Sequence, residues 1–282
     1  MLNSKITIII NTFNSEEQIF GCLNSIKSEY KVIIIENSNN NAFKQNIEKK
    51  YKNVECFLTG ANLGYGKGNN LGLSKVTSQY ALILNPDTTI ESQAIDNFFV
   101  SADKYKNFSI IGPAVQEDKD KIKYKNKDNQ DLIEVNTVKG FAMFLNMKEF
   151  ENVGFFDENF FIYFEEIDLC KRIKNLNKNI YLDPKITIHH LGGSSHNSKI
   201  NFEMELSRNW HWMWSTFYYH KKYNGFILAL FKVSGKLISS LIKSGIYLIL
   251  FNQPKKKIYN QRLSGLINSI IGKKSWYRPK IT

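Results

Sequence analysis

Four short segments contain side chains that enzymes use for metal binding, proton transfer or phosphate binding. The first, Leu84-Asn85-Pro86-Asp87-Thr88, places a carboxylate directly after an apolar run. Carboxylate oxygens suit Mg²⁺ or Mn²⁺, and a divalent cation can neutralise a diphosphate. Asn-Pro-Asp is also common turn chemistry, so a plain turn is the alternative.

The second segment holds three carboxylates, Glu165, Glu166 and Asp168, directly after the aromatic stretch 155–164. At a helix start they fit the helix dipole, and Asp168 can pair with Arg172 four residues later. Apolar neighbours would instead raise the pKa of one carboxyl group and suit it to general-base work. The pattern leaves both interpretations open.

The third and fourth segments supply histidines and glycines. Period-2 alternation places His190 on the face of a strand shared by Ile186 and Ile188, with His189 on the other face. A histidine there is either a core residue or a metal ligand beside a carboxylate. The glycines of residues 62–72 are weak evidence for a phosphate loop, although they bring backbone donors and Lys67 to a strand end.

The elements that must position these residues are apolar runs at 6–10, 32–35, 54–58 and 80–84, separated by amphipathic stretches. This alternation of apolar and amphipathic segments predicts a parallel sheet with helical crossovers. In such sheets ligands bind beyond the carboxyl ends of the strands. Ser15 to Gln18 fits a capping box for the first helix. The run at 6–10 is too short for a signal peptide and is predicted as the first core strand.

Length and composition restrict the class of protein that the chain can be. Its 282 residues, 43% of them hydrophobic, exclude global disorder and suffice for one large domain with an appendage. Three cysteines without metal-type spacing predict buried, reduced thiols in a cytosolic protein. Residues 116–131 alternate Lys with acidic and polar residues, which predicts a solvated loop or edge hairpin without chemistry.

The net charge of +12 belongs to the C-terminal part, since residues 206–282 contain 14 Lys and Arg and no Asp or Glu. Such a tail favours a polyanion: an anionic membrane surface, a nucleic acid or a phosphorylated substrate. Lys232, Lys236 and Lys243 interrupt the apolar stretch 226–251 and fall within about 40° on a helix. This pattern is typical of a helix lying in the bilayer interface.

Two alternatives for the tail remain. The apolar helix could pack against a partner subunit in a homo-oligomer. Trp210, Trp212 and Trp214, together with Tyr218 and Tyr219, lie near basic residues as nucleic-acid stacking residues do. We expect no nucleic-acid partner, because aromatics at helical spacing also form a packing face.

Taken together and in this order, the segments resemble family 2 glycosyltransferases of the GT-A fold, most closely the rhamnosyltransferase-like branch. The resemblance spans nearly the whole chain and rests on five collinear pieces: 84–88, 154–158, 160–172, 62–64 with 69–72, and His190 with Gly192-Gly193. It implies an α/β GT-A fold with a Rossmann-like, mostly parallel sheet over residues 1–205. Residues 1–90 would be the nucleotide-binding half, 91–205 the acceptor and catalytic half, and 206–282 a basic helical extension.

The resemblance also implies roles for individual residues. Glu166 corresponds to the general base, with Glu165 and Asp168 as alternatives, and Asp87 and His190 correspond to the metal site. Arg208 and Lys221 match basic positions that can face the diphosphate. The remaining positions of the nucleotide-sugar-binding set are Thr12, Asn14, Glu36, Asn62, Lys67, Asn70 and Asn85, together with Asp87.

The sequence departs from the family pattern at three positions. Glu36 and Glu166 stand where Asp is more usual, and Asn85 replaces the first acid of the family's Asp-X-Asp metal motif. These departures keep a catalytically inactive sugar-nucleotide binder among the alternatives. A nucleotidyltransferase would need a Gly- and Lys-rich loop, and residues 11–15 contain neither Gly nor Lys.

The function expected from the resemblance is inverting, Mg²⁺- or Mn²⁺-dependent transfer of a sugar from a nucleotide-diphosphate donor to a glycan hydroxyl. The donor would be dTDP-L-rhamnose, with a UDP-sugar such as UDP-galactofuranose as the alternative. The acceptor would be a lipid-linked glycan of the cell surface, such as an O-antigen or capsule. The enzyme would be peripheral on the inner face of the plasma membrane.

Overall fold

The computed structural model describes residues 2–117, 131–192 and 195–280, and the chain forms two compact units. Unit 1 comprises Met1–Phe156 and Glu166–Asn197, and unit 2 comprises Asp157–Glu165 and Ser198–Thr282. The second unit therefore begins before the expected boundary at 205/206 and also includes a segment from within the catalytic part. Most of the loop predicted at 116–131 lies outside the described residues.

The sheet of unit 1 begins with the four parallel strands that the sequence predicts. They are β1 (Ile6–Thr12), β2 (Lys31–Glu36), β3 (Val54–Leu58) and β4 (Tyr80–Leu84). The strands lie in the order β3-β2-β1-β4. Their carboxyl ends meet at one edge of the sheet, where the polar segments follow them.

The second half of the sheet is mixed rather than parallel. It comprises β5 (Thr88–Ile90), β6 (Phe108–Glu117), β7 (Ile133–Glu134), β8 (Ala142–Asn146) and β9 (Asn179–His190). β8 is antiparallel to β4 and β6, while β5 and β7 are antiparallel to β9. β9 is one long strand where two pieces were expected, because a register shift against β6 accommodates the irregularity between them.

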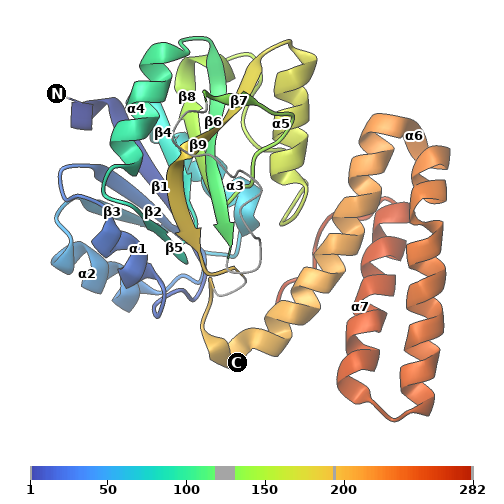
Figure 1. Cartoon of the computed structure of the whole chain (residues 1–282). Helices are drawn as coiled ribbons and strands as arrows, with labels where there is room; N and C mark the ends of the chain where they lie inside the picture. Colours follow the sequence, from blue (N-terminus) through green and yellow to red (C-terminus); the bar gives the residue numbers. More distant parts are fainter. Residues whose placement is uncertain (1, 118–130, 193–194, 281–282) are drawn as a thin grey trace. The chain divides into compact units, whose positions relative to one another are not determined.

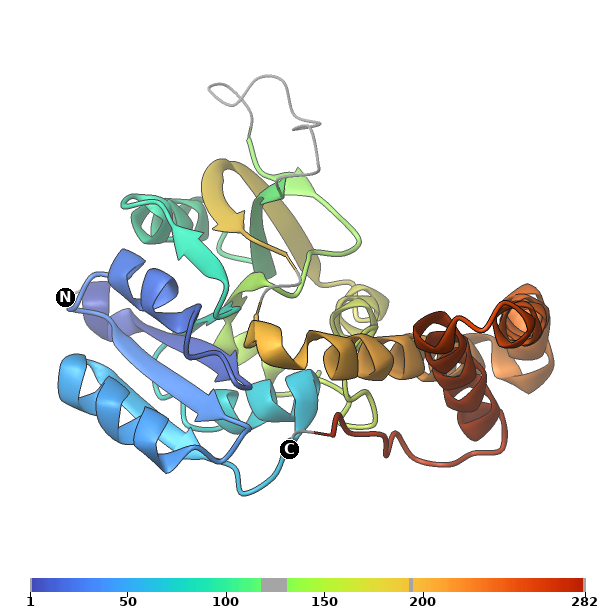
Figure 2. The same ribbon diagram turned by 90° about the horizontal axis from the view of Figure 1, so that it is seen from below.

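Helices cover both faces of this sheet (Figures 1 and 2). On one face α1 (Ile19–Ser25), α2 (Asn41–Lys50) and α4 (Ala94–Lys104) share a core with Ile8 and Ile10. On the other face α3 (Gly64–Leu73) and α5 (Glu165–Asn175) share a core with Ile9. The alternation of β1 residues between the two cores is the period-2 pattern of a strand buried on both faces.

The predicted capping box at the start of α1 is wrong. The helix begins at Ile19, and its N-cap residue Gln18 makes no side-chain cap. The Ser15 hydroxyl instead accepts from the Phe13 N–H at 3.1 Å and donates to the Ser195 carbonyl at 2.6 Å. A tertiary hydrogen bond to a distant segment replaces the local cap.

Unit 2 contains a helical hairpin. Helix α6 runs over Asn201–Ile249 with a kink at Gly225 (φ 79°), and α7 covers Gln253–Ile270 (Figure 1). The left-handed φ at the kink is a conformation that glycine adopts without steric cost. The two helices enclose an apolar core whose members are Met213, Phe217, Ala229, Val233 and Leu266.

Burial of the three cysteines is confirmed, and all are free thiols. Burial raises the pKa of Cys22, Cys56 and Cys170 to about 12. These thiols are therefore protonated at neutral pH and do not act as nucleophiles or metal ligands.

Gly265→Ala tests the close packing of the hairpin. A Cβ at Gly265 would lie 2.1 Å from the backbone oxygen of Trp210, so α7 would have to move away from α6. We expect a loss of roughly 1–3 kcal/mol in the stability of unit 2, as overpacked sites show. Tryptophan fluorescence during thermal unfolding measures this directly, because all four tryptophans belong to unit 2.

The matched control for Gly265→Ala is Gly245→Ala in α6, where an added Cβ would meet nothing within 4 Å. In an exposed helix interior this change should stabilise by up to about 1 kcal/mol. Equal melting temperatures for the two variants would contradict the packing described here.

Candidate active site

The turn after β4 contains a buried carboxylate. The Thr88 N–H and hydroxyl both donate to the Asn85 carbonyl, at 3.2 and 2.7 Å, so the Asn-Pro-Asp turn forms as one interpretation predicts. The Asp87 side chain is 1% exposed, and neither of its oxygens has a hydrogen-bond donor among the described residues. A turn alone does not require such a group, and an unpaired buried carboxylate is costly.

His190 lies beside this carboxylate. In register, β9 places His190 opposite Thr88, and the His190 Nε2 is 3.4 Å from the Asp87 Oδ1. The imidazole ring also stacks on Phe141, with ring centroids 4.5 Å apart. His189 points elsewhere: its Nε2 lies 3.5 Å from Glu91 Oε1, and its side chain is 51% exposed. The structure therefore places His190, rather than His189, beside Asp87.

These two residues fit a divalent cation that shares its coordination with a substrate. Mg²⁺ bound to phosphates uses one or two carboxylates and keeps several waters. Asp87 supplies buried oxygens for which the described part of the chain offers no hydrogen-bond donor, and His190 supplies a ring nitrogen nearby. Over the described residues, no group of three or more His, Cys, Asp and Glu gathers to form an all-protein metal site.

The segment Gly140-Phe141 joins the surroundings of Asp87 to those of Glu166. The Phe141 carbonyl accepts from the Asn85 N–H at 2.9 Å, and the Gly140 carbonyl accepts from the Tyr65 hydroxyl. A Cβ at Gly140 would lie 3.6 Å from the Glu166 Cβ. Sequence reasoning missed this segment because it contains no cluster of titratable side chains.

A cavity of about 380 Å³ lies beside Glu166 in unit 1, within the size range of small-molecule sites. Its lining residues are Pro113, Thr137, Val138, Lys139, Phe141, Glu166, Ile167 and Leu182. Burial raises the pKa of Glu166 and outweighs the hydrogen bonds from its own N–H and that of Ile167, which lower it. A carboxyl group with a raised pKa beside a cavity is suited to proton transfer.

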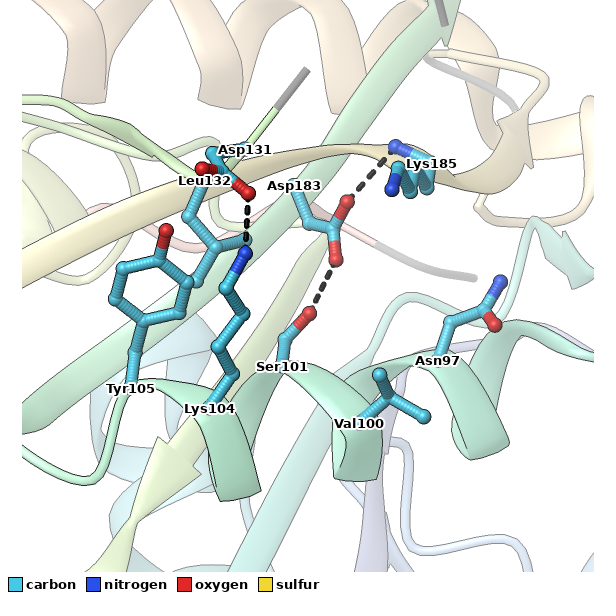
Figure 3. A pocket seen from close by; sticks show the side chains of 9 residues that line it. All are labelled: Asn97, Val100, Ser101, Lys104, Tyr105, Asp131, Leu132, Asp183 and Lys185. Carbon is cyan, nitrogen blue, oxygen red and sulfur yellow. Dashed lines mark hydrogen bonds and ion pairs between the residues drawn. The ribbon is translucent and has the colours of Figure 1, made fainter. Parts of the chain in front are cut away.

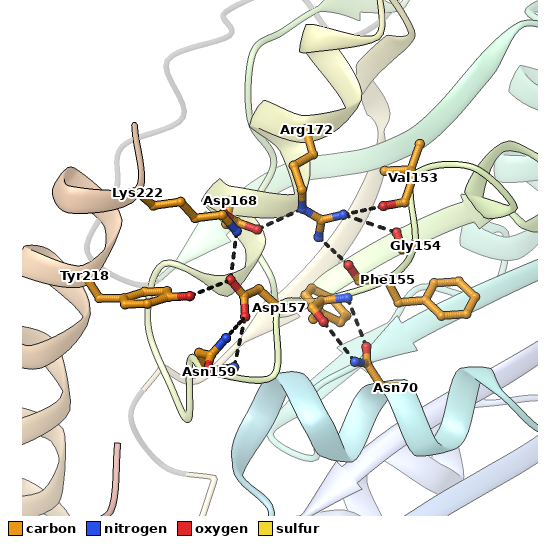
Figure 4. Close-up of polar contacts among 11 residues, drawn as sticks. Asn70, Val153, Gly154, Phe155, Asp157, Asn159, Asp168, Arg172, Tyr218 and Lys222 are labelled. Carbon is orange, nitrogen blue, oxygen red and sulfur yellow. Dashed lines mark hydrogen bonds and ion pairs between the residues drawn. The ribbon is translucent and has the colours of Figure 1, made fainter. Parts of the chain in front are cut away.

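The other two carboxylates of this segment lie in different surroundings. The Asp168 carboxylate accepts from Arg172 Nε at 2.9 Å, so the expected pairing four residues apart is present (Figure 4). Arg172 also donates to the carbonyls of Val153 and Phe155 and so fixes the loop before Phe156. Glu165 is 5% exposed and, like Asp168, does not line the cavity.

Two residues of the expected nucleotide-sugar set bind backbone groups of the protein. The Glu36 carboxylate accepts the N–H groups of Ser38 at 2.9 Å and Asn40 at 2.8 Å. The Asn70 amide donates to the Phe156 carbonyl at 2.9 Å and accepts its N–H at 3.0 Å (Figure 4). Both side chains hold backbone in place, so they shape the site through the loops they fix.

The remaining members of the set in unit 1 lie at the strand ends. The Thr12 hydroxyl donates to the Ile35 carbonyl at 3.3 Å, and Asn62 caps the Gly64 N–H at 3.1 Å. Asn14 has a left-handed φ of 49°, and its buried Nδ2 has no acceptor among the residues described. Lys67 is exposed on α3, because the glycine segment forms the first turns of that helix rather than a loop.

Two asparagines that were not assigned roles connect these strand ends. Asn37 donates to the Asn11 amide oxygen and accepts the Leu63 N–H at 3.1 Å, while Asn11 donates to the Gly64 carbonyl at 3.0 Å. This network fixes the start of α3 against β1 and β2. In the sequence, both asparagines are recognisable only as polar residues at the carboxyl end of an apolar run.

The basic residues of unit 2 are separated by helix geometry. Arg208 and Lys221 are thirteen residues apart on α6, which places them about 140° apart around the helix and about 20 Å along it. They cannot both face one diphosphate, and Lys221 instead lies 5.8 Å from the ring centroid of Phe226. Trp210 and Trp214 are 0% and 3% exposed, so they pack in the interior and are unavailable for stacking on a nucleic acid.

A second cavity, of about 80 Å³, lies between α4 and β9 (Figure 3). Its polar groups bind one another: Ser101 donates to Asp183, which also accepts the Lys185 N–H at 2.8 Å, and Lys104 pairs with Asp131. It is much smaller than a small-molecule site, so we assign it no ligand.

The chain is an α/β protein in which a buried acid–histidine pair and a separate carboxylate beside a cavity lie in unit 1. Residues 7–170 match the model of glycosyl transferase family 2, which is more than half of the chain. The chain belongs to glycosyl transferase family 2, and the resemblance noted from its motifs is confirmed.

Two proteins to which the chain is similar in sequence are named as sugar transferases. The Escherichia coli K12 rhamnosyltransferase WbbL is 25% identical over 75% of this chain and 91% of its own. The low-salt glycan biosynthesis hexosyltransferase Agl10 of Haloferax volcanii is 26% identical over 62% of this chain. This match spans 63% of Agl10, less than two thirds of that relative's length.

Solved structures share the fold. TarS 1–349 of S. aureus in complex with UDP has a TM-score of 0.56 at 16% identity, covering 99% of this chain and 94% of its own. The mannosyltransferase PcManGT of Pyrobaculum calidifontis, in complex with GDP-Man and Mn²⁺, has a TM-score of 0.57 at 10% identity, covering 94% and 87%. The expected GT-A fold with a C-terminal helical region is confirmed.

Asp87→Asn tests the buried carboxylate. The variant should lose sugar transfer and the divalent-ion dependence of nucleotide binding, because the neutral amide is a poor cation ligand. In metal-free buffer it should melt at a higher temperature than the wild type, because a neutral amide replaces a buried carboxylate that has no hydrogen-bond donor among the described residues. Calorimetric titration of the nucleotide with and without Mg²⁺, and thermal unfolding in EDTA, measure both effects.

The control for Asp87→Asn is Glu91→Gln, which removes the exposed carboxylate beside His189 and should change neither quantity. Full transfer activity in EDTA would rule out a metal at Asp87 and His190.

Proposed function

We propose that this protein is an inverting, divalent-metal-dependent glycosyltransferase. It transfers L-rhamnose from dTDP-L-rhamnose to a hydroxyl of a growing, lipid-linked polysaccharide of the cell surface. The observation that carries the proposal is the buried Asp87 carboxylate, without a hydrogen-bond donor in the described part of the chain and 3.4 Å from His190. Glu166 lines a cavity of the same unit.

The proposed transfer needs only a general base and a metal site from the protein. Inverting transfer uses one general base on the acceptor side and no protein nucleophile, and Glu166 removes the proton of the attacking hydroxyl. Asp87 and His190 hold the cation, which when bound stabilises the negative charge of the leaving diphosphate. Phe141 packs against His190 and lines the cavity of Glu166, so it fixes the orientation of the imidazole ring.

The names of relatives support rhamnose as the donor sugar. They include WbbL, the dTDP-rhamnosyl transferase RfbF of Shigella flexneri, and an N-acetylglucosaminyl-diphospho-decaprenol L-rhamnosyltransferase of Mycobacterium tuberculosis. The last name also supports a sugar-diphospho-lipid as the acceptor. A UDP-sugar is the alternative donor, and the UDP complex of TarS favours it.

The second half of α6 supports attachment to a membrane. Ala229, Val233 and Ser240 face the hairpin interior, while Phe231 and Ile249 lie about 200° around the helix and are 80% and 74% exposed. The helix Ser198–Ile249 is long and apolar enough to cross a membrane by length and composition, with 17% of its most apolar window buried. An outward apolar face of this size favours a lipid surface.

The charges favour a peripheral position at the inner face of the plasma membrane. Lys232, Lys236 and Lys243 lie beside the outward apolar face, and each held near the bilayer centre would cost about 2.5–3 kcal/mol. At the surface each would gain about 1 kcal/mol from anionic headgroups. A second copy of the chain is the other occupant that could cover this face.

Glu166→Gln should lower kcat by roughly 10²–10⁴ and leave the affinity for the donor nearly unchanged. For the wild type, kcat/KM should fall as pH is lowered through a pKa above the usual glutamate range, because the base must be ionised and burial raises its pKa. Steady-state assays across pH check this prediction. A larger kcat loss in Glu165→Gln or Asp168→Asn would show that the base is misassigned.

The intact protein should pellet with anionic liposomes at low salt and be partly released at high salt. Phe231→Asp with Ile249→Asp should abolish sedimentation, because both changes place charge on the outward face of α6. The control is Val100→Asp in α4, an apolar residue of unit 1 that is 67% exposed. Unchanged sedimentation of the double variant would exclude this face, and concentration-dependent dimerisation that it abolishes would assign the face to a second copy.

A further inference from the structure

The hydroxyl of Tyr65 makes a hydrogen bond that the function proposed above does not use. Tyr65 lies in the first turn of α3, and its hydroxyl donates to the Gly140 carbonyl, 75 residues further along the chain. Its ring packs edge-on against Phe156, with the ring centroids 5.9 Å apart. All three residues belong to unit 1, so these contacts are internal to that unit.

The backbone of Tyr65 is held independently of its hydroxyl. Its carbonyl accepts from the Asn11 amide at 3.2 Å and from the Asn69 amide at 3.0 Å. The preceding Gly64 carbonyl also accepts from Asn11, at 3.0 Å. α3 lies so close to the end of β1 that a Cβ at Gly68 would be 2.6 Å from the Asn11 side chain. The start of α3 is therefore a well-anchored support from which the Tyr65 ring extends.

The segment that Tyr65 contacts is a loop. Within the described part of the chain, residues 135–141 lie between β7 and β8 and form neither a helix nor a strand. The last of them, Phe141, accepts from the Asn85 N–H at 2.9 Å. Backbone groups outside regular structure need side-chain or tertiary hydrogen bonds to replace the missing regular ones. The Tyr65 hydroxyl supplies such a bond at Gly140, directly before Phe141.

Gly140 and Phe141 lie against both parts of the proposed catalytic site. The Phe141 ring is nearly parallel to the His190 ring, with an interplanar angle of 7° and centroids 4.5 Å apart. A Cβ added at Gly140 would lie 3.3 Å from the Tyr65 hydroxyl oxygen and 3.6 Å from the Glu166 Cβ. One short segment therefore packs on the imidazole of the metal site and lies close to the base.

We propose that Tyr65 is a positioning residue that sets the spacing between the metal site and the general base. Its hydroxyl holds the Gly140 carbonyl, and through the adjacent Phe141 ring it keeps the His190 imidazole in place. The inference rests on the proposed function, since it takes the acid–histidine pair as the metal site and Glu166 as the base. Group transfer requires the residues that serve the leaving diphosphate and the attacking hydroxyl to keep a fixed separation. A misplacement of about 1 Å can lower the rate about 100-fold.

Tyr65→Phe tests the hydroxyl alone, because the ring that packs against Phe156 remains. We would assay dTDP-L-rhamnose with N-acetylglucosaminyl-diphospho-decaprenol at saturating Mn²⁺. The value of kcat should fall roughly 10- to 100-fold, because the segment at Gly140 is released. The donor KM should change less than about twofold, since the loss arises in the chemical step. A kcat within about twofold of the wild type would overturn the proposal.

The matched control is Tyr51→Phe. The Tyr51 hydroxyl donates to the Asn24 side chain at 2.7 Å, and its ring packs against the core on the opposite face of the sheet from Tyr65. This variant loses a tyrosine hydrogen bond without any contact to residues 135–141, so kcat and both KM values should be unchanged. Thermal unfolding of the two variants checks that each remains folded at the assay temperature.

A double-variant cycle separates positioning from a general loss of stability. In calorimetric titrations of Mn²⁺ in the presence of dTDP, Tyr65→Phe should weaken binding about tenfold, at the lower end of the effects of groups that orient metal ligands. Phe141→Leu removes the stacked ring and should weaken it by at least as much. If Tyr65 acts through Phe141, the double variant should bind within about twofold of Phe141→Leu. Losses that multiply in the double variant would show that Tyr65 does not act through this ring, contrary to the proposal.

A further measurement needs neither turnover nor metal. The ring current of Phe141 shields protons of an imidazole stacked on its face, so the His190 ring resonances of the wild type should lie upfield of their usual positions. Tyr65→Phe should move them back toward those positions, and Tyr51→Phe should leave them in place. The spectrum of His190→Gln assigns the resonances, because it lacks them. His190 resonances that Tyr65→Phe does not move would rule out the positioning role.

The two proposals fail differently. If the wild type transfers no sugar while Tyr65→Phe moves the His190 resonances and weakens Mn²⁺ binding, the proposed function is wrong and the role of Tyr65 in orienting His190 stands. If transfer and the Glu166→Gln loss are observed but Tyr65→Phe behaves like Tyr51→Phe, the function stands and the positioning role is wrong.

Discussion

A buried carboxylate without a hydrogen-bond donor is the constraint around which unit 1 is arranged. Asp87 is buried in the turn between β4 and β5, its oxygens have no hydrogen-bond donor among the described residues, and the His190 Nε2 lies 3.4 Å from its Oδ1. Such a group is costly unless a cation binds it. The antiparallel part of the sheet supplies the surroundings, because β5 pairs with β9 and brings His190 opposite Thr88.

The balance between burial and local hydrogen bonding decides which carboxylate of α5 is suited to chemistry. Arg172 Nε donates to the Asp168 carboxylate and pairs with it. At Glu166 desolvation outweighs the two backbone hydrogen bonds and raises the pKa. The three carboxylates therefore lie in different surroundings, and Glu166 is the one that lines the cavity.

Helix α6 combines two separate tasks on either side of its kink. Before Gly225, Ser215, Tyr218 and Lys222 donate hydrogen bonds to the loop Asp157–Glu165. After Gly225, the side turned away from α7 exposes large apolar residues in a region without any acidic side chain. The kink therefore separates a segment that holds this loop from a segment with an exposed apolar side.

The sequence by itself determined the N-terminal half of the sheet, the family and the charge of the tail. Buried β-branched runs with polar ends are local signals, and β1 to β4 follow them closely. Only the tertiary structure decided which histidine adjoins Asp87 and which acid lines the cavity, because both depend on strand register and on burial by distant residues. Asn70 matched a binding position, yet its amide binds the backbone of Phe156, which the sequence does not show to be near. The contribution of Gly140 and Phe141 was likewise invisible, because a carbonyl and a ring face leave no pattern of residue types until the chain brings their partners together.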